Sequence, residues 1–377
     1  MSKTRSPLHV RLYWLLHRYN PFRAEVGLRA IGNPGPDAPV LVSGNFEPIV
    51  EELEQVLDGF HVWLLVVDSA GINVWCAAGV GDFNEHKMVD ALVATRLSEK
   101  VTSRRLVVSP LAAVGIDRDR LRRDSGFDVI WGPAHLDDLP AFLRAGGVKR
   151  TPEMRLARFP LRDRFEQAIG IMGVFALSLV LIPWHRREVL WFYASVAHAV
   201  FGTMLTYDVL PPKYPANKTM LLAAIQAVVL LALRPTSGMP LSRRLIIGLV
   251  AHFLVALDMI GSTPFFKTTI VHWLSTGNNE SLFQPGFNES CTSCGRCLEV
   301  CPKGLFSRTD APEKTVGLEG EHRHATSKPR MTIDLSKSCC ECLACVKQCP
   351  MHAIDNIGRG WKDDIKSLDA LPERRQA

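Results

Sequence analysis

The sequence has no strong excess of charge of either sign. Its 44 Lys and Arg residues stand against 38 Asp and Glu residues, which gives a formal net charge of +6 over 377 residues. Nucleic-acid-binding proteins usually concentrate a larger positive charge in one basic patch. We therefore expect no nucleic-acid partner. The headgroups of membrane lipids account for the basic residues that flank the apolar segments described below.

Two further signals are missing from the N-terminal half. The apolar stretch at residues 13–16 is far too short for the hydrophobic region of a secretory signal peptide, so we expect the N-terminal domain to stay in the cytoplasm. A dinucleotide-binding loop of the form GxGxxG is incomplete, because Gly79 and Gly81 are followed by Asn84 where the third glycine would stand. Support for a nucleotide-binding loop is therefore weak.

Cysteine is scarce outside one region. Eight of the ten cysteines form two runs with the same spacing, CxxCxxCxxxCP, and only Cys76 and Cys340 lie outside the pattern. This spacing is typical of a ferredoxin with two 4Fe-4S clusters, in which the fourth cysteine of each run binds the other cluster. The predicted ligands are Cys291, Cys294, Cys297 and Cys349 for cluster 1, and Cys339, Cys342, Cys345 and Cys301 for cluster 2.

Structural zinc and disulfides are the alternatives for these cysteines. Zinc sites usually combine two CxxC pairs across a longer gap, and they do not repeat a run of four cysteines. So closely spaced a set belongs to a metal site in a reducing compartment, which disfavours disulfides. We therefore expect an α+β ferredoxin domain of the bacterial type at residues 278–377, facing the cytoplasm. The polar insert at residues 307–330 is expected to be a surface loop or disordered.

Hydropathy divides the rest of the chain into an α/β domain at residues 1–150 and a transmembrane helical domain at residues 151–277. A bilayer-spanning helix needs about 20 apolar residues, and four apolar runs are close to that length. They are residues 165–184, 189–207, 220–233 and 245–264. The run at 220–233 is the shortest, and a buried soluble helix is the alternative there. Four spans predict a multi-pass protein of the inner (cytoplasmic) membrane with both soluble domains on the cytoplasmic side.

Three polar residues lie within the apolar runs. His198, His252 and Asp258 are costly to expose to lipid, so we expect them to face the interior of the helical bundle. The two histidines could bind a haem as axial ligands, or they could form hydrogen bonds between helices. Hydrogen bonding between helices is the simpler interpretation, because it requires no cofactor.

In the N-terminal domain, apolar runs of strand length alternate with helical patterns, which predicts a Rossmann-like parallel sheet covered by helices. Expected strands are residues 40–42, 62–67, 72–75, 106–108 and 128–131, and expected helices are 48–57 and 84–98. Ligands of such sheets bind at the carboxyl ends of the strands. Cys76 follows one expected strand and precedes a helix whose dipole favours a thiolate. An inert buried cysteine is the alternative.

The segment Asn73-Val74-Trp75-Cys76-Ala77-Ala78-Gly79 resembles the cap-helix motif of the mercury-methylating corrinoid protein family (HgcA). The two-cluster ferredoxin resembles that family's electron-donating partner (HgcB), here joined in one chain. Further similar segments lie at residues 104–111, 125–127, 132–133, 138–143 and 261–268. The resemblance implies that residues 73–79 bind a corrinoid (cobalamin) and that Cys76, the catalytic residue, is the lower axial thiolate ligand of cobalt.

The resemblance also implies a reaction. A corrinoid-dependent methyltransferase of this family passes a cobalt-bound methyl group to Hg(II), and a soft thiolate opposite the methyl helps it leave as a carbanion. Cobalt then has to regain two electrons, which the ferredoxin would supply from a low-potential electron donor. A one-electron radical route is the alternative. The implied methyl source is a methylated corrinoid or a methyl-tetrahydrofolate pathway.

The chain departs from the family at two places. Val80 stands where the family usually has lysine, and neither residues 356–361 nor the tail contains the cysteines thought to pass mercury. Cys340 is the one spare cysteine near the clusters, and we interpret it as a passive neighbour. Two alternative functions therefore stay open: a corrinoid methyl carrier with another soft electrophile or one-carbon partner as acceptor, and a membrane electron-transfer ferredoxin without methyl chemistry.

Overall fold

The computed structural model describes residues 23–161, 164–165, 168–169, 171–173, 187–210, 215–233, 239–262, 285–309, 330–334, 337, 339–340 and 342–356. The chain divides into two compact units. One combines Met1–Pro21 with Arg158–Gly277, and the other combines Phe22–Ala157 with Asn278–Ala377. The α/β part and the cysteine-rich part therefore belong to the same compact unit, although more than a hundred residues separate them in the sequence.

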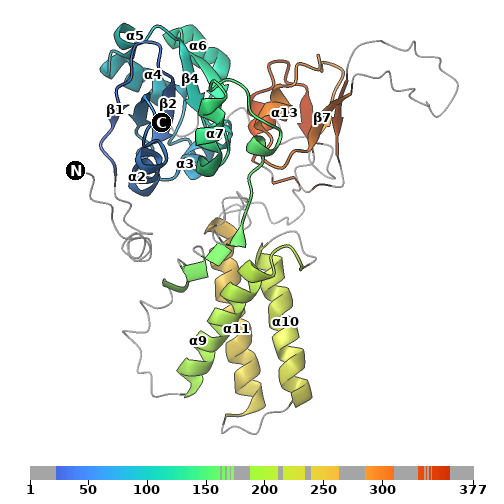
Figure 1. Ribbon diagram of the computed structural model, residues 1–377. Coiled ribbons are helices and arrows are strands. Elements are labelled where there is room, and N and C mark those ends of the chain that lie inside the picture. Colours follow the sequence, from blue (N-terminus) through green and yellow to red (C-terminus); the bar gives the residue numbers. More distant parts are fainter. Residues whose placement is uncertain are drawn as a thin grey trace, which may run out of the picture. The chain divides into compact units, whose positions relative to one another are not determined.

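A five-stranded sheet organises the α/β part, with the strand order β1-β3-β2-β4-β5 (Figure 1). Strands β2 to β5 run parallel, as predicted, whereas β1 pairs antiparallel with β3 at one edge and was missed. The mixed α/β class is confirmed. The strands are β1 (Gly27–Ile31), β2 (Val40–Gly44), β3 (Val62–Val67), β4 (Arg105–Val108) and β5 (Asp128–Trp131).

The helices cover both faces of this sheet, because successive strand residues point to opposite sides. Val42, Leu65 and Val108 belong to the core on one face, and Leu41, Leu64 and Val107 belong to the core on the other. The α-helices are α2 (Glu47–Val56), α3 (Val74–Val80), α4 (Glu85–Ala94), α5 (Leu97–Lys100), α6 (Arg118–Ser125) and α7 (Leu139–Arg144). Short 3-10 helices are η1 (Pro110–Ala112), η2 (Leu136–Asp138) and η3 (Glu153–Arg155).

Two predictions for this part were wrong. The expected strand at 72–75 is the start of helix α3, because the Asn73 carboxamide oxygen accepts a hydrogen bond from the Trp75 amide at 3.1 Å and caps the helix. The expected helix at 84–98 is two helices, α4 and α5. They are separated at Arg96, whose φ of +48° lies in the left-handed region and interrupts the helical geometry.

Three helices pack side by side in the other compact unit: α9 (Arg187–Leu205), α10 (Pro215–Leu233) and α11 (Leu241–Ser262) (Figure 1). In the part of the chain that the structure describes, α9 is the one helix long and apolar enough to cross a membrane. The apolar stretch of α10, Asn217–Ala232, is shorter. Most of the predicted run at 165–184 lies outside the described residues, so the four-helix bundle stays a prediction.

The two histidines of this helical unit contact each other. His198 Nδ1 on α9 lies 3.1 Å from His252 Nε2 on α11, and His252 Nδ1 lies 2.8 Å from the Gly248 carbonyl oxygen. This is the hydrogen bond between helices that the sequence allowed. Ring nitrogens at this separation leave no room for a haem iron between them. The side chain of Asp258 lies outside the described residues.

Where the structure describes the cysteine-rich part, it contains two short helices and two small antiparallel strand pairs. Helix α13 is Arg296–Val300 and helix α14 is Ala344–Lys347. Strand β6 (Pro285–Phe287) pairs with β9 (Ile354–Asn356), and β7 (Phe306–Thr309) pairs with β8 (Arg330–Ile333). The predicted loop at 307–330 was therefore wrong at both ends, which form β7 and β8. Its central residues, and those from 357 onward, lie outside the described residues.

Candidate functional site

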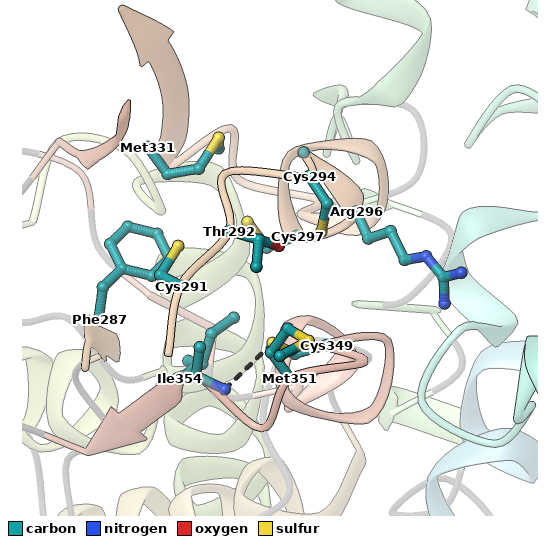
Figure 2. Close-up of a pocket in the computed structure, with 12 residues that line it drawn as sticks. Phe287, Cys291, Thr292, Cys294, Arg296, Cys297, Met331, Cys349, Met351 and Ile354 are labelled. Atoms are coloured by element: carbon teal, nitrogen blue, oxygen red, sulfur yellow. Dashed lines mark hydrogen bonds between the residues drawn. The ribbon is translucent and has the colours of Figure 1, made fainter. Parts of the chain in front are cut away.

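Four cysteines surround a first hollow (Figure 2). Cys291, Cys294 and Cys297 come from the first run, and Cys349 comes from the end of the second. Cys297 lies on α13, whose N-terminus follows Gly295 in a left-handed conformation with a φ of +83°. The Cys349 sulfur accepts a hydrogen bond from the Ala353 amide at 3.2 Å. The residues predicted for cluster 1 thus lie around one space.

A second hollow has the complementary set of sulfurs. Its walls contain Cys339, Cys342 and Cys345 from the second run and Cys301 from the first. The Cys301 sulfur accepts a hydrogen bond from the Leu305 amide at 3.4 Å. Each hollow therefore combines three cysteines of one run with the last cysteine of the other, which is the exchange expected of a two-cluster ferredoxin.

The cysteine sets fit iron–sulfur clusters better than single metal ions. A structural zinc site usually takes two CxxC pairs, whereas here each hollow takes three cysteines of one run and the last cysteine of the other. The cysteines lie within an apolar core that includes Leu305, Phe306 and Met331. A 4Fe-4S cluster takes four such thiolates, and an apolar surrounding shields it from solvent.

Burial governs the protonation of these thiols. It raises the pKa of Cys297 to about 12, with the nearby Cys294 adding to the shift, and it also raises the pKa values of Cys301 and Cys345. These thiols are consequently neutral near pH 7 in the absence of a cluster. These cysteines would have to lose their protons to hold a cluster, so cluster binding would be coupled to proton release.

Cys340 lines the second hollow together with the four expected ligands. It is buried, with 5% of its surface exposed, and lies beside Cys342. This hollow therefore has one more sulfur than a 4Fe-4S cluster requires. The interpretation of Cys340 as a passive neighbour stays a prediction.

Cys76 lies in the first turn of α3, three residues after the capping Asn73. Ala77 and Ala78 on this helix are buried in the domain core, whereas Cys76 is exposed. The buried alternative considered for Cys76 is therefore wrong. The surrounding protein still removes enough water to raise the pKa of its thiol, while the first turn of a helix favours the thiolate. The predicted segment 73–79 thus presents one accessible sulfur.

The loop before α3 depends on Asn45, which sequence reasoning missed. Its side-chain oxygen accepts hydrogen bonds from the Ser69 amide at 2.8 Å, the Gly71 amide at 2.9 Å and the Ser69 hydroxyl at 3.1 Å. Its amide nitrogen donates to Asp68 Oδ1 at 3.2 Å. Asn45 is buried and follows directly after β2. A polar residue at the carboxyl end of a buried parallel strand was the available signal.

Fold and cysteine sets together define a protein that joins an α/β domain to a domain of the two-cluster ferredoxin type. Residues 8–143 match the family model described as the CO dehydrogenase/acetyl-CoA synthase delta subunit. Residues 290–354 match the family model of the 4Fe-4S dicluster domain. The match to the first family ends with the α/β part of the chain.

Three curated relatives are each similar to about a third of this chain. The acetyl-CoA decarbonylase/synthase complex subunit gamma of Archaeoglobus fulgidus is 36% identical over 115 residues, 30% of this chain and 24% of the relative. The same subunit of Methanopyrus kandleri is 32% identical over 135 residues, covering 35% and 29%. The corrinoid/iron-sulfur protein large subunit of Moorella thermoacetica is 30% identical over 127 residues, covering 33% and 28%. The chain spans about a quarter of the length of these relatives.

Proposed function

We propose that the chain is a corrinoid-dependent methyltransferase whose α/β domain holds the corrinoid beside Cys76. The observation that carries this proposal is the exposed cysteine in the first turn of α3, within residues 8–143, which match the CO dehydrogenase/acetyl-CoA synthase delta subunit model. A corrinoid/iron-sulfur protein large subunit is among the chain's relatives. A bound corrinoid would supply the cobalt that carries the methyl group. Cys76 would donate its soft thiolate to that metal. Asn73 and Asn45 would keep the helix and its preceding loop in place.

The cysteine-rich domain would restore electrons to this site. Transfer of a methyl carbanion leaves a two-electron deficit, and each 4Fe-4S cluster handles one electron at a time. Two cysteine-lined hollows in the same compact unit as Cys76 are consistent with this requirement. A low-potential electron donor would recharge them.

We further propose Hg(II) as the methyl acceptor, because residues 73–79 resemble the cap helix of the mercury-methylating family. The proposal includes a location in the cytoplasmic membrane, with α9, α10 and α11 among the membrane helices and both soluble domains on the cytoplasmic side. The apolar length of α9 supports this location. A multi-pass anchor would place the chain beside membrane lipid.

A corrinoid methyl carrier with a different acceptor is the second candidate. The similarity to acetyl-CoA decarbonylase/synthase subunits favours it. So does Val80, which is exposed on α3 where the mercury-methylating family usually has lysine. In this case, the acceptor would be a one-carbon pathway partner or another soft metal or metalloid.

The deciding experiment uses the full chain purified anaerobically with cobalamin. After loading with a methyl group, the protein receives Hg(II) and a thiol, and methylmercury is measured beside Cys76→Ala and Cys76→Ser variants. Serine keeps the size of cysteine but replaces the soft sulfur by a hard oxygen, so both variants should lose activity. Bound corrinoid without methylmercury would support the second candidate. Failure to bind corrinoid would overturn both.

A further inference from the structure

The cysteine-rich domain makes specific contacts with the α/β domain inside their shared compact unit. Gln348 is 3% exposed and donates both of its amide hydrogens, to the Ala113 carbonyl at 2.7 Å and the Ile116 carbonyl at 2.6 Å. A side-chain carboxamide has only these two hydrogens to give. Gln348 therefore commits its whole donor capacity to the loop that follows η1.

An ion pair between α13 and α6 forms a second contact between the two domains. Arg296 donates two hydrogen bonds to the Asp119 carboxylate, at 2.6 and 3.0 Å. This paired arrangement fixes orientation as well as distance. Nearby, the Arg150 guanidinium donates to the Glu299 carbonyl at 2.8 Å. The contact thus involves both α6 and the segment that follows α7.

Apolar packing accompanies the polar contacts. Val300 and Ala344 of the cysteine-rich domain belong to the same buried core cluster as Ala112 and Ala113 of the α/β domain. Helix α13 also lies against η1. The two domains therefore share a continuous core, which a loosely tethered ferredoxin would not do.

The loop that receives Gln348 also supports the helix that bears Cys76. A Cβ atom added to Gly115 would lie 2.9 Å from the Ala78 Cα atom and 2.2 Å from the Phe83 carbonyl oxygen. Only glycine permits so close an approach of the loop to α3. Contacts therefore run without a gap from Gln348, through residues 113–116, to α3.

Both contacting residues adjoin predicted cluster ligands. Gln348 directly precedes Cys349, and Arg296 lies between Cys294 and Cys297. The side chains that dock the domain are thus adjacent in the sequence to cysteines that line the first hollow.

We propose that the loop at residues 113–116 is the docking surface through which the cysteine-rich domain serves the Cys76 site of its own chain, with Gln348 as the positioning residue. The identity of the electron acceptor rests on the proposed function, whereas the docking does not. Each event passes one electron across this contact and leaves the donor cluster oxidised by one electron. A low-potential one-electron reductant then restores the cluster.

The first test is Gln348→Glu, which keeps the shape of the side chain but turns an oxygen toward the two carbonyls. The matched control is Lys347→Gln, which makes the same change of one charge unit on the neighbouring residue. Iron and sulfide contents should stay at the wild-type values in both. Hydrogen exchange at residues 112–117 should accelerate on the order of tenfold in Gln348→Glu and stay unchanged in the control.

A charge exchange tests the docking through a second contact, and its first substitution, at Asp119, lies far from the cysteines in the sequence. Asp119→Arg should accelerate exchange at residues 112–117, and the added Arg296→Asp substitution should reverse that effect by restoring an ion pair. Asp124→Arg is the control on the same helix, because Asp124 pairs with Arg120 at 3.6 Å. Unchanged exchange in both Gln348→Glu and Asp119→Arg would overturn the docking.

The third test measures how fast protein-bound cobalamin is reduced after the protein is mixed with titanium(III) citrate. The double variant Cys297→Ser/Cys345→Ser, which removes one predicted ligand from each cluster, supplies the rate of direct reduction by titanium, which is subtracted. Delivery within one chain predicts a rate constant that does not depend on protein concentration and that falls about tenfold in Gln348→Glu. Electron transfer within one chain would be refuted by a rate constant that rises with protein concentration. A rate constant that is the same in Gln348→Glu as in the wild type would refute it as well. Failure to bind cobalamin would refute the proposed function. The hydrogen-exchange measurements at residues 112–117 would still test the docking in that case.

Discussion

Replacement of Asn45 should loosen the loop that leads to Cys76. In Asn45→Ala, the amides of Ser69 and Gly71 lose their acceptor, which now lies at 2.8 and 2.9 Å. A buried donor left without a partner costs about 1–3 kcal/mol. Since water can partly replace the lost acceptor in a surface loop, we expect a total of about 2–4 kcal/mol. Ala70 and Gly71, which have φ values of +57° and +71°, would also lose their constraint.

Hydrogen exchange is the appropriate assay, because a chain with two compact units does not unfold in one step. A loss of about 2–4 kcal/mol in local opening free energy corresponds to exchange roughly 30- to 1,000-fold faster at residues 69–71. Asn45→Asp keeps the acceptor oxygen but places a second carboxylate near Asp68, so it should lose only about 1 kcal/mol. Asn33→Ala, an exposed substitution after β1, is the control. Less than threefold acceleration in Asn45→Ala would refute the reasoning.

Three further predictions concern other parts of the same compact unit. Gly115→Ala should destabilise the packing of its loop on α3 by about 1–3 kcal/mol, seen as faster labelling of the Cys76 thiol by a maleimide; an unchanged labelling rate at Cys76 would contradict the close approach. Cys339→Ser should remove iron and sulfide from the second hollow, whereas Cys340→Ser should leave the contents unchanged, and the reverse result would reassign the ligand. Arg118 donates two hydrogen bonds to the Asp128 carboxylate, at 2.8 and 3.1 Å, and lowers its pKa. The ionised carboxylate therefore stabilises the fold at any pH above its unfolded pKa of about 3.9. This contribution is lost as the pH falls through the lower pKa of the folded state. Asp128→Asn should accordingly accelerate exchange in β5 at pH 7, by about 1 kcal/mol in opening free energy for a partly exposed pair, and the difference from wild type should shrink below about pH 4.

Local sequence patterns were sufficient for the parts whose partners are close in the chain. The strands at 62–67 and 128–131 were predicted with the observed bounds, because buried parallel strands are continuous apolar runs. The cysteine spacing likewise predicted the two sets that line the hollows. These assignments need only residue type and spacing.

Prediction failed where local and tertiary preferences compete. Residues 72–75 have the apolar composition of a strand, but the Asn73 cap and the end of β3 at Val67 make them a helix start. Helix α6 contains one buried residue, Leu121, among charged neighbours, so it has no apolar periodicity to detect. The edge strand β1 is mostly half-buried and gives a similarly weak signal.

The sequence by itself determined which sulfur atoms are candidates for the chemistry: those of two cysteine runs with cluster spacing, and that of Cys76 in the segment 73–79. Only the tertiary structure decided where those atoms lie relative to one another. Asn45 reaches the loop before Cys76 across 24 to 26 residues, and Gln348 reaches residues 113 and 116 across 235 and 232 residues. A side-chain amide has no preferred partner in the sequence. Its partners are chosen when folding buries it, because a buried donor left unpaired costs more free energy than the folded state can afford to lose.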